Sequence, residues 1–290
     1  MSTISLCLIA KDEETRLPAC LQSVKGIVDE IIVLDTGSID ETVAIAHQFK
    51  AKVRTFEWND DFAAARNVSL DYATGDWILV LDADEQLVDG AETAIREAIS
   101  SENGLVVNLL RQEVGAAQSP YSSVSRLFRN HPSLRFNRPY HAMIDDSVTE
   151  LLHNEPHWQI LEIPTVTIRH DGYQSEAIAQ HNKLERARAA METFLAAHPQ
   201  DAYVCSKLGA LYVQMGEVKK GQQLLEQGLK SITTTGKGDV VIAYELHYHL
   251  GIAYRGQQQL DKAQFHYEQA LCPPNPKPQT PCFSTNKKLT

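Results

Sequence analysis

The chain has 290 residues, a length that accommodates one large domain or two smaller ones. Apolar residues make up 43% of it and charged residues 22%, which is ordinary globular composition and excludes wholesale disorder, collagen-like repeats and a membrane bundle. Acids outnumber bases by 37 to 27, and the excess lies in residues 1–100, with 19 acids and 8 bases, whereas residues 101–290 hold 18 and 19. Neither part is basic, so we expect no nucleic-acid partner.

The sequence carries no signal for a membrane or for export. No stretch approaches the roughly 18 consecutive apolar residues of a transmembrane helix. The start, MSTISLCLIAKDEE, lacks the basic beginning and the small-residue cleavage site of a secretory signal. The five cysteines form no Cys-x-x-Cys pair, which favours reduced thiols over disulfides or a zinc site. We therefore expect a cytoplasmic location, with the inner face of the membrane as an alternative.

Strand and helix signals alternate over the first 100 residues. Short, almost wholly apolar runs are typical of strands buried on both faces, and such runs occur at Ile4–Ala10, Glu30–Leu34, Val53–Phe56 and Trp77–Leu81. Helical patterns lie between them, at Glu13–Val24, Asp40–Phe49 and Phe62–Ala73. This alternation predicts a parallel sheet covered by helices on both faces. Ligands of such sheets bind beyond the carboxyl ends of the strands.

Charged and polar residues follow three of these strands: Lys11-Asp12-Glu13, Asp35-Thr36-Gly37-Ser38 and Asp82-Ala83-Asp84. Asp82 and Asp84, two apart after a buried strand, would repel each other unless a cation neutralises them. Oxygen ligands of this kind suit Mg²⁺ or Mn²⁺, which usually bind together with substrate phosphates. The alternative is that Asp84 or Glu85 merely caps the following helix. The position of the pair directly after a strand, with Asp35 at an equivalent strand end, favours a functional site.

The pattern changes between residues 104 and 170. Short β-like runs are separated there by polar, proline-bearing loops, and they lie at Leu105–Leu110, Val124–Phe128, Leu134–Phe136 and Val166–Arg169. These runs predict an antiparallel or mixed extension of the sheet, which would form the acceptor side of the site. Helix is expected again from Ser175 to Ala197 and onward to about residue 271.

The helical part contains a repeat. Leu208-Gly209-x-x-Tyr212 recurs as Leu250-Gly251-x-x-Tyr254, and small residues follow at the same spacings in both copies: Gly221 and Gly228, then Ala263 and Ala270. Small residues at such positions let two helices pack closely, as in the tetratricopeptide pattern. The copies are 42 residues apart rather than about 34, a difference that the polar stretch Thr233–Asp239 would absorb. Two copies are fewer than a free-standing solenoid needs, so we expect them to lean on another part of the protein or on a second subunit.

Four motifs occur in the order and spacing of a known family: SLCLIAKDEE, DEIIVLDTGSIDET, DFAAARN and GDWILVLDADE. The sequence resembles a family 2 glycosyltransferase of the GT-A fold joined to tetratricopeptide repeats. The resemblance is strong over residues 1–100, loose over 120–175 and limited to the repeat over 200–271. It implies an α/β fold with a mixed sheet flanked by helices, followed by an all-α tetratricopeptide-like domain. The expected parts are a GT-A domain over 1–174, a helical domain over 175–272 and a disordered, proline-rich tail over 273–290.

The resemblance also implies roles for individual residues. The counterpart of Asp35 hydrogen-bonds the base of the nucleotide, that of Asp84 ligates the divalent metal, and that of Asp82 lies by the ribose and the metal. Arg66 matches an arginine near the nucleotide, against the alternative of a salt bridge on a helix surface. Two further residues after the first strand are assigned to the nucleotide-sugar site: Lys11 and Glu13.

The later motifs fit less closely. Relatives of this architecture carry Arg-Phe, then His-Glu, then a His-Tyr-Gly-Tyr-like motif, where this chain reads Arg135-Phe136, Asp145-Asp146 and His170-Asp171-Gly172-Tyr173. His170 matches the family's third metal ligand, and Asp146 aligns with the family's acidic residue, for which Asp145 could substitute. An inverting transfer needs one carboxylate to take the proton of the acceptor. Four arginines could include a contact to the diphosphate, although most are expected on a solvated face: Arg126, Arg129, Arg135 and Arg138.

These features predict a metal-dependent, inverting glycosyltransferase that uses Mn²⁺ or Mg²⁺ and a nucleoside-diphosphate sugar, most simply a UDP-sugar. An acidic cleft would repel a sugar diphosphate on its own, so the charge balance also predicts that a divalent cation binds with the donor. The acceptor stays open between glycan, lipid and polypeptide, and the repeats would hold it, bind a protein partner or pair two subunits.

Two other classes of protein are alternatives. One is a catalytically degenerate GT-A domain that serves as a scaffold for the repeats, which the departure at Asp145-Asp146 supports and the presence of Asp35, Asp82 and Asp84 opposes. The other is a nucleotidyltransferase, which typically needs a glycine-rich and basic loop after the first strand. The sequence there is Lys11-Asp12-Glu13-Glu14, which is not such a loop.

Overall fold

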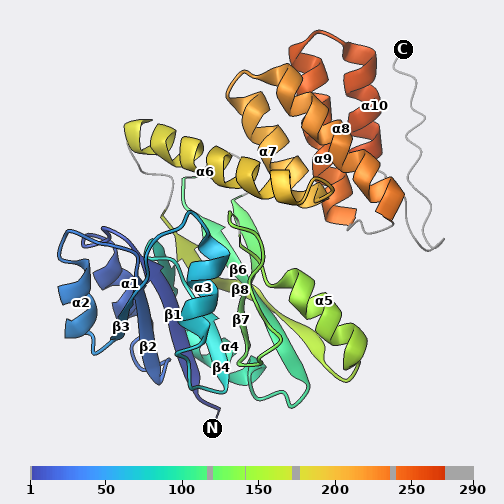
Figure 1. Cartoon of the computed structure of the whole chain (residues 1–290). Coiled ribbons are helices and arrows are strands. Elements are labelled where there is room, and N and C mark those ends of the chain that lie inside the picture. The colour runs from blue at the N-terminus through green and yellow to red at the C-terminus, as the bar shows by residue number, and fades with distance from the viewer. Residues whose placement is uncertain (1, 116–119, 141, 172–176, 236–239, 272–290) are drawn as a thin grey trace. The chain divides into compact units, whose positions relative to one another are not determined.

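The structure is a computed structural model, and it describes these stretches of the chain: residues 2–115, 120–140, 142–171, 177–235 and 240–271. The chain forms two compact units, Met1–His181 and Asn182–Thr290 (Figure 1). The predicted domain boundary at residues 174 and 175 falls outside the described residues, as does the predicted tail over 273–290.

The first unit is built on one mixed sheet. Its strands in chain order are β1 (Ile4–Ala10), β2 (Glu30–Asp35), β3 (Lys52–Thr55), β4 (Trp77–Val80), β5 (Glu85–Leu87), β6 (Gly104–Glu113), β7 (Tyr121–Arg129) and β8 (Gln159–His170). They lie side by side in the order β3-β2-β1-β4-β7-β6-β8-β5. β1 to β4 run parallel, β7 is antiparallel to both β4 and β6, β8 is parallel to β6, and β5 is antiparallel to β8. The predicted mixed sheet is confirmed.

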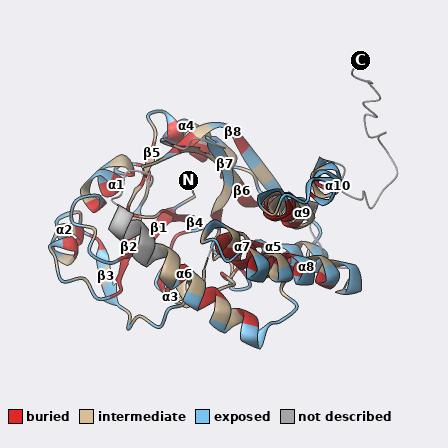
Figure 2. Cartoon of the chain, turned by 90° about the horizontal axis from the view of Figure 1, so that it is seen from above, coloured by how far each residue is buried: buried red, intermediate tan, exposed pale blue. Residues whose placement is uncertain are grey.

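The side chains of the central strands are divided between two cores, one on each face of the sheet. Leu6 and Leu8 of β1 lie in one core, whereas Cys7 between them lies in the other. β4 shows the same division, with Leu79 in the first core and Ile78 in the second. Because successive strand residues point to opposite faces, a strand covered on both faces has to be apolar throughout. Figure 2 shows these central strands as buried.

Helices cover both faces of this sheet (Figure 1). Three helices supply residues to the first core: α1 (Leu17–Ser23), α2 (Thr42–Gln48) and α4 (Ala91–Ala98). Two helices supply residues to the second core: α3 (Phe62–Leu70) and α5 (Asp145–Asn154). The strands β1, β2 and β4 are thereby largely buried, whereas β3, β7 and β8 each have exposed residues.

Several boundaries differ from the sequence prediction. The helix expected over Glu13–Val24 begins only at Leu17, with a proline in its first turn, because the preceding residues hydrogen-bond to the neighbouring loop. The strand predicted at Leu134–Phe136 is wrong, since both of these residues are buried in the second core but their segment is not part of the sheet. Three elements were not predicted from the sequence: β5, α4 and α5.

The second unit consists of helices. The helical part of the chain comprises α6 (Ala177–Ala197), α7 (Ala202–Gln214), α8 (Val218–Thr235), α9 (Val240–Gly256) and α10 (Leu260–Leu271). α7 packs on α8 and α9 packs on α10. A Cβ atom on Gly221 would lie 2.6 Å from the carbonyl oxygen of Gly209, and one on Gly251 would lie 2.5 Å from the ring of Tyr267. The small residues of the repeat therefore stand where helices pack closely, as predicted.

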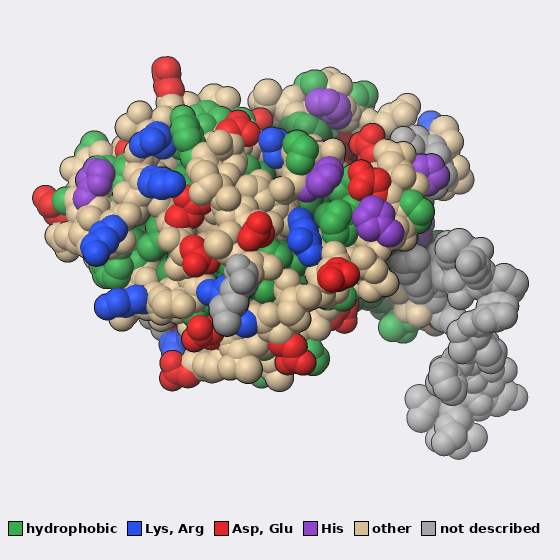
Figure 3. Space-filling model, turned by 90° about the horizontal axis from the view of Figure 1, so that it is seen from below, with side chains coloured by type: hydrophobic (Ala, Val, Ile, Leu, Met, Phe, Trp, Pro, Cys, Tyr) green, Lys and Arg blue, Asp and Glu red, His purple; other side chains and the backbone are tan. Residues whose placement is uncertain are grey.

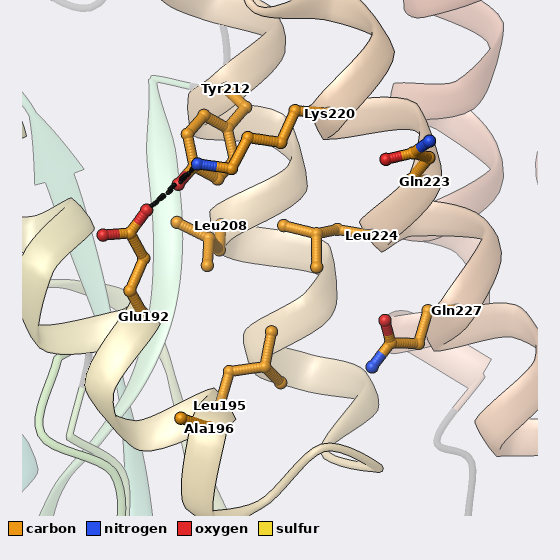
Figure 4. Close-up of a pocket in the computed structure, with 9 residues that line it drawn as sticks. All are labelled: Glu192, Leu195, Ala196, Leu208, Tyr212, Lys220, Gln223, Leu224 and Gln227. Carbon is orange, nitrogen blue, oxygen red and sulfur yellow. Dashed lines mark hydrogen bonds and ion pairs between the residues drawn. The ribbon is translucent and has the colours of Figure 1, made fainter.

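A groove of about 410 Å³ lies between α6, α7 and α8 (Figure 4). Leu195, Leu208 and Leu224 form its apolar wall. Glu192 closes one side, where it accepts hydrogen bonds from the hydroxyl of Tyr212 and, at 3.2 Å, from Nζ of Lys220. In the portion of the chain described, no helix is both long and apolar enough to cross a bilayer.

Candidate functional site

Asp35 lies at the carboxyl end of β2, opposite Ala10 at the end of β1. It is 5% exposed, and its carboxylate accepts hydrogen bonds from the backbone N–H groups of Gly37 (3.2 Å) and Ser38 (3.1 Å). Gly37 has a φ of 100°, a conformation that glycine adopts at little cost. Asp35 therefore shapes the loop that follows β2 and stands at the predicted edge of the sheet.

The loops after β1 and β2 are bound to each other. The backbone N–H of Asp12 donates to Oγ of Ser38 at 3.0 Å, and that of Glu13 donates to Oγ1 of Thr42 at 2.7 Å. Burial raises the pKa of Glu13, against an opposing effect of Arg16. The charges of Asp84 and Asp82 raise it further, which places Glu13 near the pair that follows β4. Lys11 is exposed at the start of the same loop.

Asp82 is held between two arginines. Its Oδ1 lies 2.6 Å from Nη2 of Arg66, and its Oδ2 lies 2.8 Å from Nη2 of Arg126. Burial of the carboxyl group raises its pKa, but the charges and hydrogen bonds of Arg66 and Arg126 outweigh this effect and hold the pKa below its ordinary value. Asp82 is therefore a carboxylate whose two oxygens are both engaged by the protein's own cations.

Both arginines retain N–H groups that the described part of the protein does not satisfy. Nε and Nη1 of Arg66 and Nη1 of Arg126 are buried without a hydrogen-bond partner among the described residues. Arg66 is 7% exposed and lies over the ring of Phe136 at 5.4 Å, so it is not the surface residue that the alternative interpretation assumed. Buried polar groups are nearly always hydrogen-bonded, and these N–H groups are suited to an anion.

A bulge in β7 accompanies the placement of Arg126. Val107 pairs with Leu127 and Leu109 pairs with Val124, so Ser125 and Arg126 together stand opposite the single residue Asn108. Such an extra residue bends a strand and re-aims a side chain, and bulges are common beside active sites. This shift in register could not be read from the alternation of the sequence.

Asp84 lies beside His170, the last residue of β8. Nε2 of His170 is 3.3 Å from Oδ2 of Asp84, and its Nδ1 is 2.6 Å from Oε2 of Glu113. The hydrogen bond to Asp84 raises the pKa of His170 to about 9, burial acts against it, and the bond to Glu113 adds to it. The imidazole is thus enclosed by two carboxylates, which approach its two ring nitrogens from different sides.

The pairing of three strands produces this arrangement. His170 of β8 stands opposite Glu85 of β5 on one side and opposite Glu113 of β6 on the other. Arg111, two residues before Glu113, contacts Oε1 of Glu85 at 2.6 Å and Oε1 of Glu113 at 2.8 Å. Glu85, whose side chain is fully buried, also lies 3.7 Å from Nη2 of Arg126. A chain of alternating charges therefore connects Asp82 to Asp84. Its members, in order of contact, are Asp82, Arg126, Glu85, Arg111, Glu113, His170 and Asp84.

The spacing of Asp84 and His170 fits a divalent ion. Ligands of Mg²⁺ lie about 2.1 Å from the ion, so two of them at a right angle lie about 3 Å apart, close to the 3.3 Å between His170 Nε2 and Asp84 Oδ2. Over the stretches described, no three His, Cys, Asp or Glu side chains are grouped so that they could hold an ion alone. Two protein ligands suffice where substrate phosphates and water complete the shell. Asp82, with both oxygens engaged, is not favoured as a third ligand.

Asp145 and Asp146 form the first turn of α5. Although both residues are exposed, desolvation of the Asp145 carboxyl raises its pKa, and the charge of Asp146 adds to this effect. A hydrogen bond with Ser125, the neighbour of Arg126, acts in the opposite direction. Asp146 lies 3.0 Å from Nη1 of Arg138. The structure thus links Asp145 to the bulge of β7, whereas Asp146 is paired with an arginine.

Two other arginines singled out in the sequence contact side chains of the protein itself. Arg129 lies over the rings of Trp77 at 4.9 Å and Trp158 at 5.5 Å, and Arg135 pairs with the exposed Asp71 at 3.2 Å. The cleft that the sequence predicts to be acidic also contains bases, since Arg66, Arg111 and Arg126 form ion pairs with Asp82 and Glu85. His170 lies beside Asp84, and Arg16 lies 3.6 Å from Glu13.

Comparison with known proteins now decides the family. The model of glycosyl transferase family 2 matches residues 5–161. The chain belongs to glycosyltransferase family 2. A Synechococcus elongatus protein, the TPR repeat-containing protein Synpcc7942_0270, is 50% identical to this glycosyltransferase over 274 residues, which cover 94% of this chain and 67% of that protein. The SPbeta prophage-derived glycosyltransferase SunS of Bacillus subtilis is 29% identical over 206 residues, which cover 69% of this chain and 46% of SunS.

A solved structure shares the fold of this glycosyltransferase. S. aureus TarS 1-349, solved in complex with UDP-GlcNAc, matches with a TM-score of 0.55 and 14% identity, over 92% of this chain and 91% of TarS 1-349. At this identity the likeness concerns the fold alone. It confirms the predicted GT-A architecture of a mixed sheet with flanking helices and a following helical region.

Three residues of the charge network in this family 2 glycosyltransferase were not predicted from the sequence: Glu85, Arg111 and Glu113. Arg111 and Glu113 carried a signal, because they are two apart at the end of the apolar run Leu105–Leu110 and therefore share one face of the strand. Glu85 follows Asp84 directly and was considered only as a helix cap. Its function as a buried partner of Arg111 depends on pairing between β5, β8 and β6, which no local pattern shows.

Proposed function

We propose that this glycosyltransferase is metal-dependent and inverting, and that it transfers a sugar from a nucleoside-diphosphate sugar, most simply a UDP-sugar. The observation that carries the proposal is the pair of Asp84 and His170, 3.3 Å apart at the carboxyl ends of the strands. The chain of alternating charges connects this pair to Asp82, which contacts Arg66 and Arg126. These arginines have buried N–H groups without a partner among the described residues, and such groups suit phosphate oxygens. One site therefore combines groups for a cation and groups for an anion.

The donor would lie along the carboxyl edge of the sheet. Asp35 would hydrogen-bond the nucleotide base, Lys11 and Glu13 would border the nucleotide, and Arg66 and Arg126 would contact the diphosphate. Asp82 would hold these arginines in place through its two ion pairs. The choice of uridine is supported by the shared fold with TarS, which was solved with UDP-GlcNAc.

Asp84 and His170 would hold the divalent ion. Carboxylate oxygen suits both Mg²⁺ and Mn²⁺, and the imidazole nitrogen favours Mn²⁺ of the two. A bound divalent ion would offset the negative charge that develops on the departing diphosphate. Its remaining positions would be filled by the donor's phosphate oxygens and water.

Asp146 or Asp145 would act as the general base. The carboxylate takes the proton of the acceptor's nucleophilic atom while that atom bonds to the anomeric carbon. The bond between the anomeric carbon and the diphosphate oxygen breaks, and its electron pair leaves with the diphosphate. The raised pKa of Asp145 suits a base, because proton transfer is most efficient when the pKa approaches the working pH. Asp146 has the support of the family resemblance.

The helical unit would be a tetratricopeptide domain that holds the acceptor, binds a protein partner or pairs two subunits. The close packing at Gly221 and Gly251 supports this assignment, as does the name of the Synechococcus relative. The acceptor is a glycan, a lipid or a polypeptide.

Thermal unfolding in the presence of nucleotide sugars tests the proposal. A ligand that binds only the folded protein raises its apparent stability, so UDP and the correct UDP-sugar should raise the melting temperature more with Mn²⁺ than without it. A parallel assay should detect release of UDP from that sugar. A shift that is identical with and without Mn²⁺ would contradict metal dependence. Binding without any turnover would instead favour the scaffold alternative.

A further inference from the structure

We propose that Glu113 is a positioning residue for the metal site: it holds a proton on Nδ1 of His170 and fixes the orientation of the imidazole, so that Nε2 is the ring nitrogen directed to the ion. The inference rests on the proposed metal dependence and assigns a function to a residue that the sequence did not single out. Glu113 would not contact the ion or the sugar. It would act through His170 alone.

The first support is the geometry around the ring. Oε2 of Glu113 lies 2.6 Å from Nδ1 of His170, on the side opposite Nε2. A carboxylate can only accept a hydrogen bond, so Nδ1 must carry the proton in this contact. The carboxylate of Asp84 likewise only accepts, so Nε2 is a second donor in the metal-free protein. A bound ion would replace the proton on Nε2, because a metal-ligating histidine is neutral, and Glu113 would keep the proton on Nδ1. Nε2 is the atom that lies 3.3 Å from Asp84.

The second support is that Glu113 is itself held firmly. Its side chain is 8% exposed, and its other oxygen, Oε1, accepts hydrogen bonds from Nε of Arg111 at 2.8 Å and from Oγ of Ser122 at 2.6 Å. A carboxylate fixed by two donors at one oxygen presents the other oxygen in a single direction. Glu113 can therefore define the plane of the His170 ring as well as its protonated nitrogen.

The third support is the origin of these contacts in the sheet. Glu113 and His170 are paired residues of the parallel strands β6 and β8, and they are the last residues of their strands. The distance between them is thus set by backbone pairing and not by a mobile loop. Metal-ligating histidines usually donate their second ring N–H to a carboxylate or carbonyl, and losing that partner typically weakens metal binding about 10- to 100-fold.

Arg111 extends this support to the other end of the site. It contacts Glu113 and Glu85, and Glu85 in turn accepts a hydrogen bond from the backbone N–H of Asp82 at 2.9 Å. The proposed metal side and diphosphate side therefore share one buried scaffold of charges. Glu113 is the member of that scaffold that faces the imidazole.

The direct test measures the Mn²⁺ affinity of the full chain at saturating UDP. Electron paramagnetic resonance of free Mn²⁺ reports how much of the ion is bound. Glu113→Ala should weaken Mn²⁺ binding about 10- to 100-fold. Glu113→Gln keeps an acceptor oxygen without its charge, so its Mn²⁺ affinity should lie between that of Glu113→Ala and that of the unaltered protein. Asp89→Ala is the matched control, since it removes an exposed carboxylate that lies outside this network of charges. It should bind Mn²⁺ like the unaltered protein.

A second measurement requires no altered Glu113. In protein labelled with ¹⁵N at histidine and loaded with UDP and Mg²⁺, His170 should show a proton on Nδ1 and none on Nε2, with its signal assigned by its loss in His170→Gln. A proton on Nε2 in this state, or equal Mn²⁺ affinity in Glu113→Ala and the unaltered protein, would overturn the inference alone. Failure of the unaltered protein to bind Mn²⁺ with UDP would instead overturn the proposed function, and the inference with it.

Discussion

Asp82 and Asp84 are two residues apart, and their surroundings differ in kind. Asp82 is paired with Arg66 and Arg126, whereas Asp84 lies beside His170. Glu85 follows Asp84, and its Oε2 accepts a hydrogen bond from the backbone N–H of Asp82 at 2.9 Å. One carboxylate of the motif thus contacts two arginines, and the other contacts an imidazole. The sequence predicted that both belong to the site, but it could not predict this division, because the partners come from distant strands and helices.

Some residues of the site could be predicted because their signal is local. Asp35, Asp82 and Asp84 each follow an apolar run, and strand ends are the expected place for ligands. Arg66 was placed through the family motif, although only the structure shows that it is buried. Arg126 was one of four arginines that the sequence offered equally as contacts to the diphosphate. The bulge in β7 at Arg126 distinguishes it from the other three.

The identity of the base is tested by Asp145→Asn and Asp146→Asn, compared in one assay of sugar transfer or of UDP release. The substitution at the base should lower kcat about 10²- to 10⁴-fold, which is the usual contribution of a positioned base. Donor affinity should be retained in both variants, since neither residue is placed at the nucleotide. The other substitution should have a much smaller effect. Full activity in both variants would exclude the pair as the source of the base.

At the scale of elements, the three-residue strand β5 has a large effect on the site. Its antiparallel pairing with β8 places Glu85 opposite His170. The long apolar runs of β1, β2 and β4 were predicted nearly to the residue, because a strand buried on both faces has a clear composition. β5 is too short, and too polar in sequence, to produce such a signal. Its position depends on tertiary pairing.

Glu30 joins several elements at the opposite end of the sheet. Its Oε2 lies 2.6 Å from Nζ of Lys52 in β3, and its Oε1 accepts hydrogen bonds from Ser5 in β1 and from Thr74 before β4. Burial raises the pKa of Glu30, but the hydrogen bonds from these partners outweigh burial and lower the pKa from the ordinary 4.5 to about 2. Ionised Glu30 therefore stabilises the folded protein fully above a pH of about 4.5, and this contribution is lost as the pH falls toward 2.

Glu30→Gln should accordingly destabilise the protein at pH 7, and the difference from the unaltered protein should shrink as the pH falls below about 4.5. Urea unfolding of both proteins at pH 7, 4 and 3 measures this. A difference in unfolding free energy that is the same at all three values would show that the charge of Glu30 does not contribute.

The helix packing in the second unit is tested at Gly221. An added Cβ would lie 2.6 Å from the carbonyl oxygen of Gly209 and 2.7 Å from Cγ2 of Val213, so Gly221→Ala should destabilise the helices by about 1–3 kcal/mol, as overpacking does. Gly256→Ala is the control, since a Cβ there meets nothing within 4 Å. Denaturation followed by helix content should separate the two variants. Equal stability would show that α7 and α8 are less closely packed than described.

For the whole molecule, the excess of acids over bases has more than one origin. Much of it is surface charge, and on the face in Figure 3 acidic side chains are dispersed among lysines and arginines. The acids of the site are different, since Asp82, Glu85 and Glu113 are each paired with a buried or half-buried arginine. The count of charges alone suggested repulsion of the donor. In the structure Asp84 and Glu13 also have basic partners, which are His170 and Arg16.

The overall organisation was predicted better than the details of the site. The alternation of strand and helix signals predicted the parallel part of the sheet, and the repeat predicted pairs of packed helices. Both predictions rest on periodic patterns of apolar and small residues. The mixed part of the sheet was predicted in kind, but its order β4-β7-β6-β8-β5 was not. Non-local pairing of this type leaves little trace in a single sequence.

Calorimetric titration of UDP with and without Mn²⁺ tests whether Asp84 couples a divalent ion to the donor. The unaltered protein and the control Asp89→Ala, which removes an exposed carboxylate five residues farther along, should bind UDP more tightly when Mn²⁺ is present. Asp84→Ala should bind UDP with the metal-free affinity in both conditions. If Asp84→Ala retains the full gain in affinity from Mn²⁺, the metal site is not at Asp84.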